Sequence, residues 1–279
     1  MTSAPVAERA RREAPGGRSR RLGAWYVLEH ELREIRSYGV VTIAEALGAP
    51  LIAWLAFGLG VGALVQAGTG SAGIDGVPYL AFVLPAMMCG LALQVWSQEA
   101  MFGTLIGITW RRTFVAMRAT PLSVPQIATG FVLSVLVRTA TAAIPYAVVV
   151  WIAGAFSSPW APASVAAALL GAAAFGVPLM AYAATIRRDT GQPAMVFRFV
   201  VLPLTLFSGT MFPLSTLPDW LEWIGWASPL WHSSQLARAA AYGTTEPAWL
   251  VLVHLGVLVV LVAAGWWLFV LGLRRRLER

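Results

Sequence analysis

The sequence of 279 residues contains no lysine, so arginine alone carries its basic charge. The phosphate-binding loop of many ATPases, G-x-x-x-x-G-K-[ST], requires a lysine that reaches the β- and γ-phosphates. This chain cannot form that loop. We therefore expect that it is not an enzyme of this kind, and that any ATP hydrolysis linked to it takes place on a partner chain.

Cysteine and histidine are almost as scarce. The single cysteine, Cys89, lies within an apolar stretch, which excludes an intrachain disulfide and a cysteine-based metal framework. The histidines His30, His232 and His254 fall in three separate segments with no metal-ligand spacing. We predict no metal site and no cofactor in this chain, and we expect each histidine to serve packing or interface polarity.

Charged residues are also few. They make up 12% of the sequence, whereas about 25% is usual in soluble domains, and hydrophobic residues make up 58%. The mean hydropathy is +0.70. Several apolar stretches approach the roughly 20 residues that cross a bilayer as a helix. The fold class predicted is therefore an all-α membrane protein rather than a soluble α/β domain.

Six apolar stretches predict transmembrane helices, and together they define a membrane domain over residues 46–273. They cover about residues 46–66, 78–97, 127–155, 164–186, 194–207 and 248–273. The glycine-rich segment AGTGSAGIDG after the first stretch predicts an outer loop, and Pro145 predicts a kink in the third.

The arginines gather on one side of these stretches. Eight precede the first, three follow the second, two follow the fourth and four follow the sixth, the last group in a basic tail at 274–279. The opposite side holds Arg238 with Asp75, Asp219, Glu222 and Glu246. Arginine-rich loops stay on the cytoplasmic side, so we expect a multi-pass protein of the cell membrane with both termini in the cytoplasm. Topology, rather than binding to nucleic acid, explains the pI of about 10.5.

The N-terminal region divides into two parts. Residues 1–21 are basic and rich in alanine and proline, and no signal-peptide core follows them, so they predict a disordered cytoplasmic tail. Residues 22–38 predict an amphipathic helix lying on the inner leaflet. Its apolar face comprises Leu22, Trp25, Leu28, Leu32 and Ile35. Its charged residues are Glu29, Glu31, Arg33, Glu34 and Arg36.

The outer segment 207–231, FSGTMFPLSTLPDWLEWIGWASPLW, contains three prolines, two acids and four tryptophans. Indole rings favour the membrane interface, so this segment should not leave the membrane fully. We expect two short helices, one capped by Thr216 with Asp219 in its first turn, and one over about 230–241 ended by Gly243. Backbone at membrane depth needs protein or water around it, so this hairpin should line or cap a pathway. The alternative is a hairpin that only anchors the last two spans.

The run FSGTMFPLSTLPDWLEWIGWASPLWHSSQLARA resembles the outer hairpin of permease subunits of type-2 ATP-binding-cassette exporters. The likeness is to the group of the nodulation lipooligosaccharide exporter permease and the daunorubicin-resistance permeases, and it extends over nearly the whole chain. That group carries F-S-G-x-x-F-P-L-x-x-L-P-x-W-L followed by S-P-L. The matching residues here are Phe207, Ser208, Gly209, Phe212, Pro213, Leu214, Leu217, Pro218, Trp220, Leu221, Ser228, Pro229 and Leu230. The resemblance implies an outer gate, and the residues assigned to it are Phe207, Ser208, Gly209, Phe212, Pro213, Pro218, Trp220, Ser228 and Pro229.

The resemblance also implies a contact with the ATPase. Residues 102–122 look like the coupling region, in which a short cytoplasmic helix docks on the ATPase subunit. The residues implied are Arg111, Arg112, Met117, Arg118, Thr120 and Pro121. The interfacial helix would transmit the same motion through Trp25, Leu28, Glu29, Leu32 and Arg33. The alternative for the three arginines of the loop is simple topogenic charge.

Arg138 is a charge inside an apolar stretch. It lies 11 residues, or roughly 16 Å, from the expected start of the third span. A charge at this depth normally faces protein, water or a partner. Three roles are open to Arg138. It contacts an anionic headgroup of a transported molecule, its side chain extends toward the inner membrane surface, or it pairs with an acid such as Glu45 or Glu99. We favour the structural pair.

The expected function is that of a permease subunit of an ATP-driven exporter. The resemblance implies an amphiphilic cargo, either a lipid-linked oligosaccharide or a hydrophobic drug whose export confers antibiotic resistance. It implies as partners two ATPase subunits, which bind ATP and Mg, a second permease copy or paralogue, and membrane lipids.

Two other classes of function would require features that the sequence lacks. A gradient-driven secondary transporter acting alone would need a buried carboxylate and inverted repeats, and the sequence offers neither. An intramembrane hydrolase using Ser208 and His254 would be expected to carry a G-x-S-x-G elbow, which does not surround Ser208.

Overall fold

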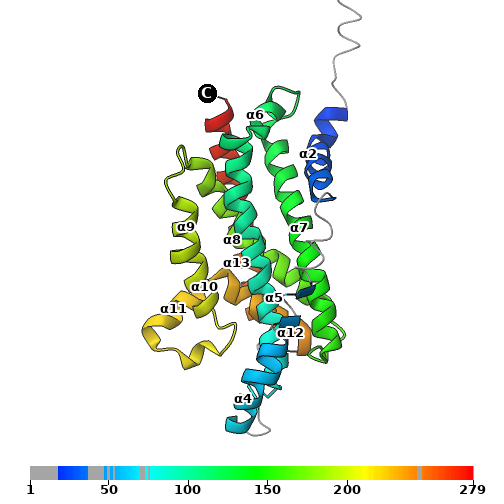
Figure 1. Cartoon of the computed structure of the whole chain (residues 1–279), viewed down its shortest axis with the longest axis vertical. Coiled ribbons are helices and arrows are strands. Elements are labelled where there is room, and N and C mark those ends of the chain that lie inside the picture. The colour runs from blue at the N-terminus through cyan, green and yellow to red at the C-terminus, as the bar shows by residue number, and fades with distance from the viewer. Residues whose placement is uncertain are drawn as a thin grey trace, which may run out of the picture.

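The computed structural model of the chain describes residues 18–36, 47–48, 51–52, 54–69, 73–74, 76–243 and 247–278 (Figure 1). Within these residues, four helices are long and apolar enough to cross a membrane. They are Tyr79–Trp110, Val124–Ile152 (α7), Ala163–Thr185 (α8) and Ala248–Leu277 (α13). A shorter apolar helix, Gln192–Phe207, comprises α9 (Gln192–Val196), η5 (Phe197–Val201) and α10 (Leu202–Phe207). The predicted all-α membrane protein is confirmed.

The number of spans remains a prediction. The stretch expected at 46–66 lies partly outside the described residues, and its described part contains the π-helix η1 (Ala56–Val61) and α4 (Gly62–Thr69). Residues 1–17 of the predicted tail 1–21 and Arg279 of the basic tail 274–279 lie outside the described residues, as do Glu45, Asp75, Glu246 and residues 37–38 of the interfacial segment. Residues 18–21, which were assigned to the disordered tail, are helical and begin α2, and residues 274–277 continue α13.

The second apolar helix is longer than expected. It was predicted to end at Ser97, but α5 (Tyr79–Gln98) continues through the π-helices η3 (Glu99–Gly103) and η4 (Ile106–Trp110). The segment EAMFGTLIGITW has no proline, and its one charge, Glu99, is paired with Arg138 of α7. Residues 102–110, the first part of the expected coupling region, therefore continue this helix and do not form a loop.

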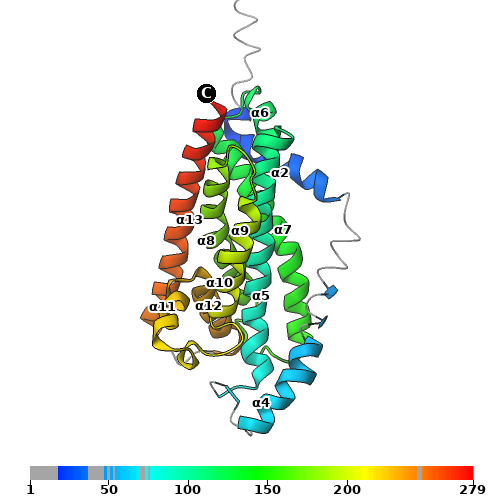
Figure 2. The ribbon, with the colours of Figure 1, turned by 60° about the vertical axis from the view of Figure 1, so that its left-hand side comes forward.

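Helix α8 forms the centre of the bundle, with α5, α12 and α13 packed around it (Figure 2). Small residues permit this close packing. A Cβ atom on Gly265 of α13 would lie 2.6 Å from the backbone nitrogen of Pro178, and one on Gly171 of α8 would lie 2.2 Å from Cβ of Ser233. The alanine-rich sequence of α8 thus allows three neighbours to approach it.

The predicted interfacial helix is α2 (Arg18–Arg36), which packs along α7. A Cβ atom on Gly130 of α7 would lie 2.5 Å from Cβ of Val27 and 2.6 Å from the carbonyl oxygen of Ala24. Val27 at this contact is buried, as is the neighbouring Leu28, whereas Trp25 is exposed. The expected single lipid face is therefore divided, because the glycine at position 130 lets part of it pack on protein.

The outer hairpin contains a 3₁₀ turn, η6 (Leu214–Thr216), followed by the two short helices predicted, α11 (Asp219–Ala227) and α12 (Pro229–Tyr242). Gly243 ends α12 with φ of +94°. The predicted cap at Thr216 was wrong: its hydroxyl donates to the carbonyl oxygen of Pro213 within the 3₁₀ turn, and α11 begins only after Pro218. The hairpin lies at the opposite end of the bundle from α6 (Thr113–Arg118) and the C-terminus (Figure 1).

Candidate transport site

The residues assigned to ATPase coupling lie at one end of the bundle, beside the C-terminus (Figure 1). Helix α6 is a short helix at the tip, and Nη2 of its Arg118 lies 3.8 Å from Oε1 of Glu278. Arg111, Arg112 and Arg118 are exposed, as are Thr120 and Pro121, while Met117 is half-buried. The geometry thus offers a basic surface of several exposed residues, and its contact with an ATPase remains a prediction.

Arg112 adopts a conformation that is unusual for a residue other than glycine. It precedes α6 with φ of +55° and ψ of +32°, the left-handed region. A side chain there costs roughly 1 kcal/mol relative to glycine. This turn changes the direction of the chain between the long helix ending at Trp110 and α6.

On α2, the two charged residues assigned to coupling pair with each other. Nη2 of Arg33 lies 2.6 Å from Oε1 of Glu29, one turn apart on the exposed side of the helix. Leu28 is buried and Leu32 is half-buried, and Trp25 projects outward. The helix therefore presents its charged pair and Trp25 away from α7.

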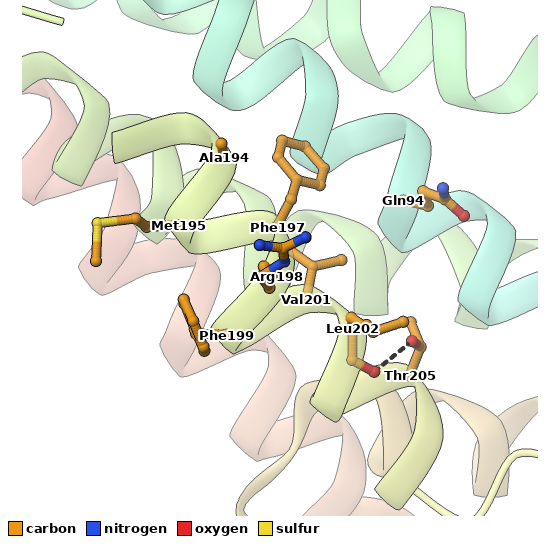
Figure 3. Close-up of a pocket in the computed structure, with 9 residues that line it drawn as sticks. All are labelled: Gln94, Ala194, Met195, Phe197, Arg198, Phe199, Val201, Leu202 and Thr205. Carbon is orange, nitrogen blue, oxygen red and sulfur yellow. Dashed lines mark hydrogen bonds between the residues drawn. The ribbon is translucent and has the colours of Figure 1, made fainter. Parts of the chain in front are cut away.

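A cavity of about 640 Å³ opens between α5 and the helix formed by α9, η5 and α10 (Figure 3). Its walls are mostly apolar, with Gln94, Arg198 and Thr205 as the polar exceptions. The lining residues are Gln94, Ala194, Met195, Phe197, Arg198, Phe199, Val201, Leu202 and Thr205. This volume lies within the about 300–1,000 Å³ typical of small-molecule sites.

The hydroxyl of Thr205 donates to the carbonyl oxygen of Leu202, 2.8 Å away (Figure 3). Gln94 and Arg198 are the longer polar side chains among the lining residues. Met195, Phe199 and Leu202 are exposed by 53–66%. Such a cavity suits a molecule with a large apolar part and a small polar group. Sequence reasoning missed it, although one glutamine and one arginine in otherwise apolar helices were visible signals.

Arg138 forms the ion pair that was favoured from sequence. Its Nη1 lies 2.5 Å from Oε1 of Glu99, and the two side chains are 33% and 23% exposed. Because α7 begins at Val124, Arg138 lies 14 residues into the helix, roughly 21 Å from its start rather than 16 Å. The pair neutralises both charges near the middle of the bundle.

The outer hairpin is fastened by Arg238 of α12. Its Nε donates to the carbonyl oxygen of Phe82 on α5, and its Nη2 donates to those of Gly209 and Thr210, at 2.9–3.1 Å. The guanidinium carbon lies 3.6 Å from the centroid of the Phe82 ring. Sequence analysis placed Arg238 only as an isolated outer charge. Its acceptors are backbone carbonyl oxygens, so no pattern of side chains in the sequence predicts these hydrogen bonds.

The predicted gate residues lie around this fastening. Oγ of Ser208 lies 2.6 Å from Oγ of Ser228, which also accepts from the backbone N–H of Leu230 at the start of α12. Trp220 and Trp223, by contrast, are 69% and 61% exposed on α11. The hairpin thus has a hydrogen-bonded base and an indole-rich tip suited to a membrane interface. The remaining assigned residues, Phe207, Gly209, Phe212, Pro213, Pro218 and Pro229, belong to the same hairpin.

Two of the three histidines meet in the structure, although they fall in separate segments of the sequence. Nδ1 of His232 on α12 lies 2.7 Å from Nδ1 of His254 on α13, and the Trp231 ring packs edge-on against both imidazoles with centroids 5.0 Å away. Helix α12 packs against α13, which brings together residues 22 positions apart. Within the described residues, no group of three or more His, Cys, Asp or Glu side chains is placed to hold a metal ion.

Ser208 and His254 do not form the contact that a hydrolase would need. The Ser208 hydroxyl lies within hydrogen-bonding distance of the Leu204 carbonyl and of Ser228, while the His254 ring contacts His232. A serine nucleophile requires a base within hydrogen-bond reach. The described geometry therefore gives no support to the intramembrane hydrolase.

Comparison with known proteins identifies the family. The sequence profile of the ABC-2 type transporter family matches residues 26–242. Nodulation protein J of Rhizobium leguminosarum bv. viciae is 27% identical over 230 residues, which are 80% of this chain and 83% of that protein. Nodulation protein J of Sinorhizobium fredii (strain NBRC 101917 / NGR234) is 26% identical, over 85% of this chain and 87% of that protein. That of Rhizobium leguminosarum bv. trifolii is 28% identical, over 95% and 97%.

No solved structure matches the chain. The family profile nevertheless covers most of the sequence, including α5, α7, α8 and the whole outer hairpin. The chain therefore belongs to the ABC-2 type transporter family.

Proposed function

We propose that this chain is the permease subunit of an exporter that moves an amphiphile from the cytoplasm or the inner leaflet to the outside. The observation that carries the proposal is the cavity between α5 and the α9–α10 helix, in a member of the ABC-2 type transporter family. Its apolar walls suit an acyl chain or an aromatic drug, and Gln94 and Arg198 suit a polar or anionic group on the same molecule. Both kinds of group in one cavity favour a lipid-like cargo.

The cavity also supports a paired arrangement. Met195, Phe199 and Leu202 leave much of their apolar surface uncovered along its rim. A second copy of this chain, or a paralogue, would cover that rim and enclose the cargo. The complex we propose contains two permease chains, two ATPase subunits that bind ATP and Mg, and surrounding membrane lipids.

The energy of ATP binding and hydrolysis would reach this chain at its cytoplasmic end. The absence of lysine excludes a phosphate-binding loop of the Walker type in this chain, so hydrolysis would occur on the ATPase subunits. Closure of those subunits would move α6 and α2. Helix α2 is packed tightly on α7 at Gly130, so its displacement would be passed to the bundle. The outer hairpin, fastened by Arg238, would open in response.

Reconstitution with the ATPase tests this proposal. In vesicles that contain the chain and its ATPase, replacing Arg111, Arg112 and Arg118 together by glutamine should uncouple ATP hydrolysis from export. The matched control replaces Arg274 and Arg275, which are also basic and lie at the same end of the bundle, and should retain coupling. Unchanged export in the triple variant would remove the coupling assignment. Export driven by an ion gradient without any ATPase would instead support a secondary transporter.

A further inference from the structure

A second hollow lies beneath the interfacial helix, separate from the cavity of Figure 3. Its volume is about 270 Å³, which is below the about 300–1,000 Å³ of sites for whole drug-sized ligands. Helices α2, α5 and α7 contribute to its wall, together with the π-helices η3 and η4 and the start of α6. A space of this size holds one ring-sized group but not a complete amphiphile.

The polar residues of this hollow are balanced in charge. Two arginines face two glutamates, accompanied by an amide and an imidazole. They are His30, Glu31, Gln98, Glu99, Arg111 and Arg138, and Thr113 adds a hydroxyl. Because positive and negative side chains are equal in number, the hollow offers no net charge to a full anion or a full cation. It does offer many hydrogen-bond donors and acceptors close together.

The central pair leaves hydrogen-bonding capacity unused. Arg138 uses Nη1 for Oε1 of Glu99, and in the part of the chain that the structure describes its Nε and Nη2 make no further hydrogen bond. Both side chains are partly exposed, at 33% and 23%, although they lie in the middle of an apolar bundle. Unsatisfied donors at this depth are costly unless water or a ligand reaches them.

Aromatic rings complete the hollow. Phe102, Phe114 and Phe131 line it, and the last two pack edge-to-face with centroids 5.1 Å apart. A Cβ atom on Gly103 would lie 2.8 Å from the Phe131 ring and 3.4 Å from Oε2 of Glu99, so glycine keeps this wall open. Flat apolar faces beside planar hydrogen-bonding groups suit a ring that has C–H faces and hydroxyl edges.

Phe102 also links the hollow to the cavity of Figure 3. Its ring stacks on that of Phe197, with centroids 6.1 Å apart and planes inclined by 12°. Phe102 lines the hollow and Phe197 lines the cavity. This single pair of rings therefore lies between the two spaces, and its separation would join them.

We propose that the hollow beneath α2 is a loading site for the head group of the exported amphiphile, and that this head group is uncharged and rich in hydroxyls. The site rests on the proposed function and adds a head-group class and an entry point to it. The head group enters from the inner leaflet beside α2 and bonds to Gln98 and the Glu99–Arg138 pair. The Phe102–Phe197 pair then separates, and the molecule passes to the cavity that holds its apolar part.

Photolabelling tests this site by location. The full chain is placed in nanodiscs of phosphatidylethanolamine and phosphatidylglycerol and is labelled with hexyl β-glucoside whose head group carries a diazirine. Mass spectrometry should find the label within residues 25–33 and 98–114. Excess hexyl β-glucoside should remove this label, whereas hexyl phosphate and hexyltrimethylammonium should not. Label confined to residues 194–205, or removed equally by hexyl phosphate, would overturn the proposal.

A variant pair sharpens the test. Gln98 is an exposed helical residue, so Gln98→Ala preserves the fold. Loss of one hydrogen bond should weaken competition at the hollow about fivefold. Thr141→Ala, an exposed position one turn beyond Arg138, is the control and should leave labelling unchanged. Equal effects of the two variants would contradict the site. Labelling requires no ATPase, so the absence of a partner ATPase would refute the proposed function without altering this result.

Discussion

Neutralising either member of the Glu99–Arg138 pair should destabilise the chain, whereas neutralising both should cost little more than one. The change is Glu99→Gln, Arg138→Gln and the double variant. Each single variant leaves a charge near the middle of an apolar bundle without its partner at 2.5 Å. The double variant leaves two neutral amides of similar size, so the destabilisations should not add.

The exposed fractions set the expected magnitude. Two charges about 4 Å apart attract by about 4 kcal/mol at the effective dielectric constant of about 20 that suits partly buried sites. Fully exposed pairs contribute about 0–1 kcal/mol, and loss of one partner from a fully buried pair costs about 3–5 kcal/mol. At 33% and 23% exposure, the pair lies between these limits. We expect a coupling free energy of about 2 kcal/mol.

Reversible unfolding in mixed micelles measures this coupling through a double-mutant cycle. Glu29 and Arg33 provide the control, because their side chains also meet at 2.6 Å but are exposed on α2. Their coupling should be only about 0.3–0.5 kcal/mol. A coupling below about 0.5 kcal/mol for Glu99 and Arg138, similar to the control, would refute the argument that this pair neutralises two charges inside the bundle.

Three further variants test the packing. Gly130→Val should detach α2 from α7 and raise amide hydrogen exchange in residues 18–36 at least about tenfold, because its Cβ would meet α2 at 2.5 Å. Gly90→Val is the control and should leave this exchange unchanged, because Gly90 has open space around it. Equal exchange in the two variants would contradict the contact between α2 and α7. Arg238→Met should lower the free energy of unfolding by about 2–4 kcal/mol and raise protease cleavage within residues 207–218, since three backbone carbonyls lose their donor. A stable, uncleaved variant would show that Arg238 does not fasten the hairpin. Arg112→Gly should raise the melting temperature and Arg112→Val should lower it, because the backbone at this position is left-handed, and equal values would contradict that geometry.

Helices such as α7 and α13 could be predicted from sequence because residues next to their ends determine where they begin and stop. Helix α7 follows a Ser123 cap with Pro125 in its first turn, and α13 follows Pro247 and ends in arginines, so the expected ranges fall within a few residues of those observed. The Glu99–Arg138 pair was also accessible, because a charge in an apolar helix requires a partner and few acids were available.

The remaining features depend on how distant segments meet. Hydropathy predicted the end of the second span near Ser97, because a charged Glu99 normally marks the end of an apolar helix. Here Arg138 of α7 neutralises that charge, and the helix continues. The pairing of His232 with His254 follows from the packing of α12 against α13, and the cavity of Figure 3 from α5 lying opposite residues 194–205. The two sides of this cavity are about 100 positions apart in the sequence, and the two histidines are 22 apart, so no local periodicity predicts either contact.

Purification of the tagged full chain from its own membrane in mild detergent tests most directly whether it is the permease of an ATP-driven exporter. Mass spectrometry of the proteins that accompany it and an ATPase assay follow. We expect a co-purifying ATP-binding-cassette ATPase, ATP hydrolysis, and, after reconstitution into vesicles, ATP-dependent movement of an amphiphile. A chain that purifies without an ATPase and still transports in response to an ion gradient would contradict this expectation.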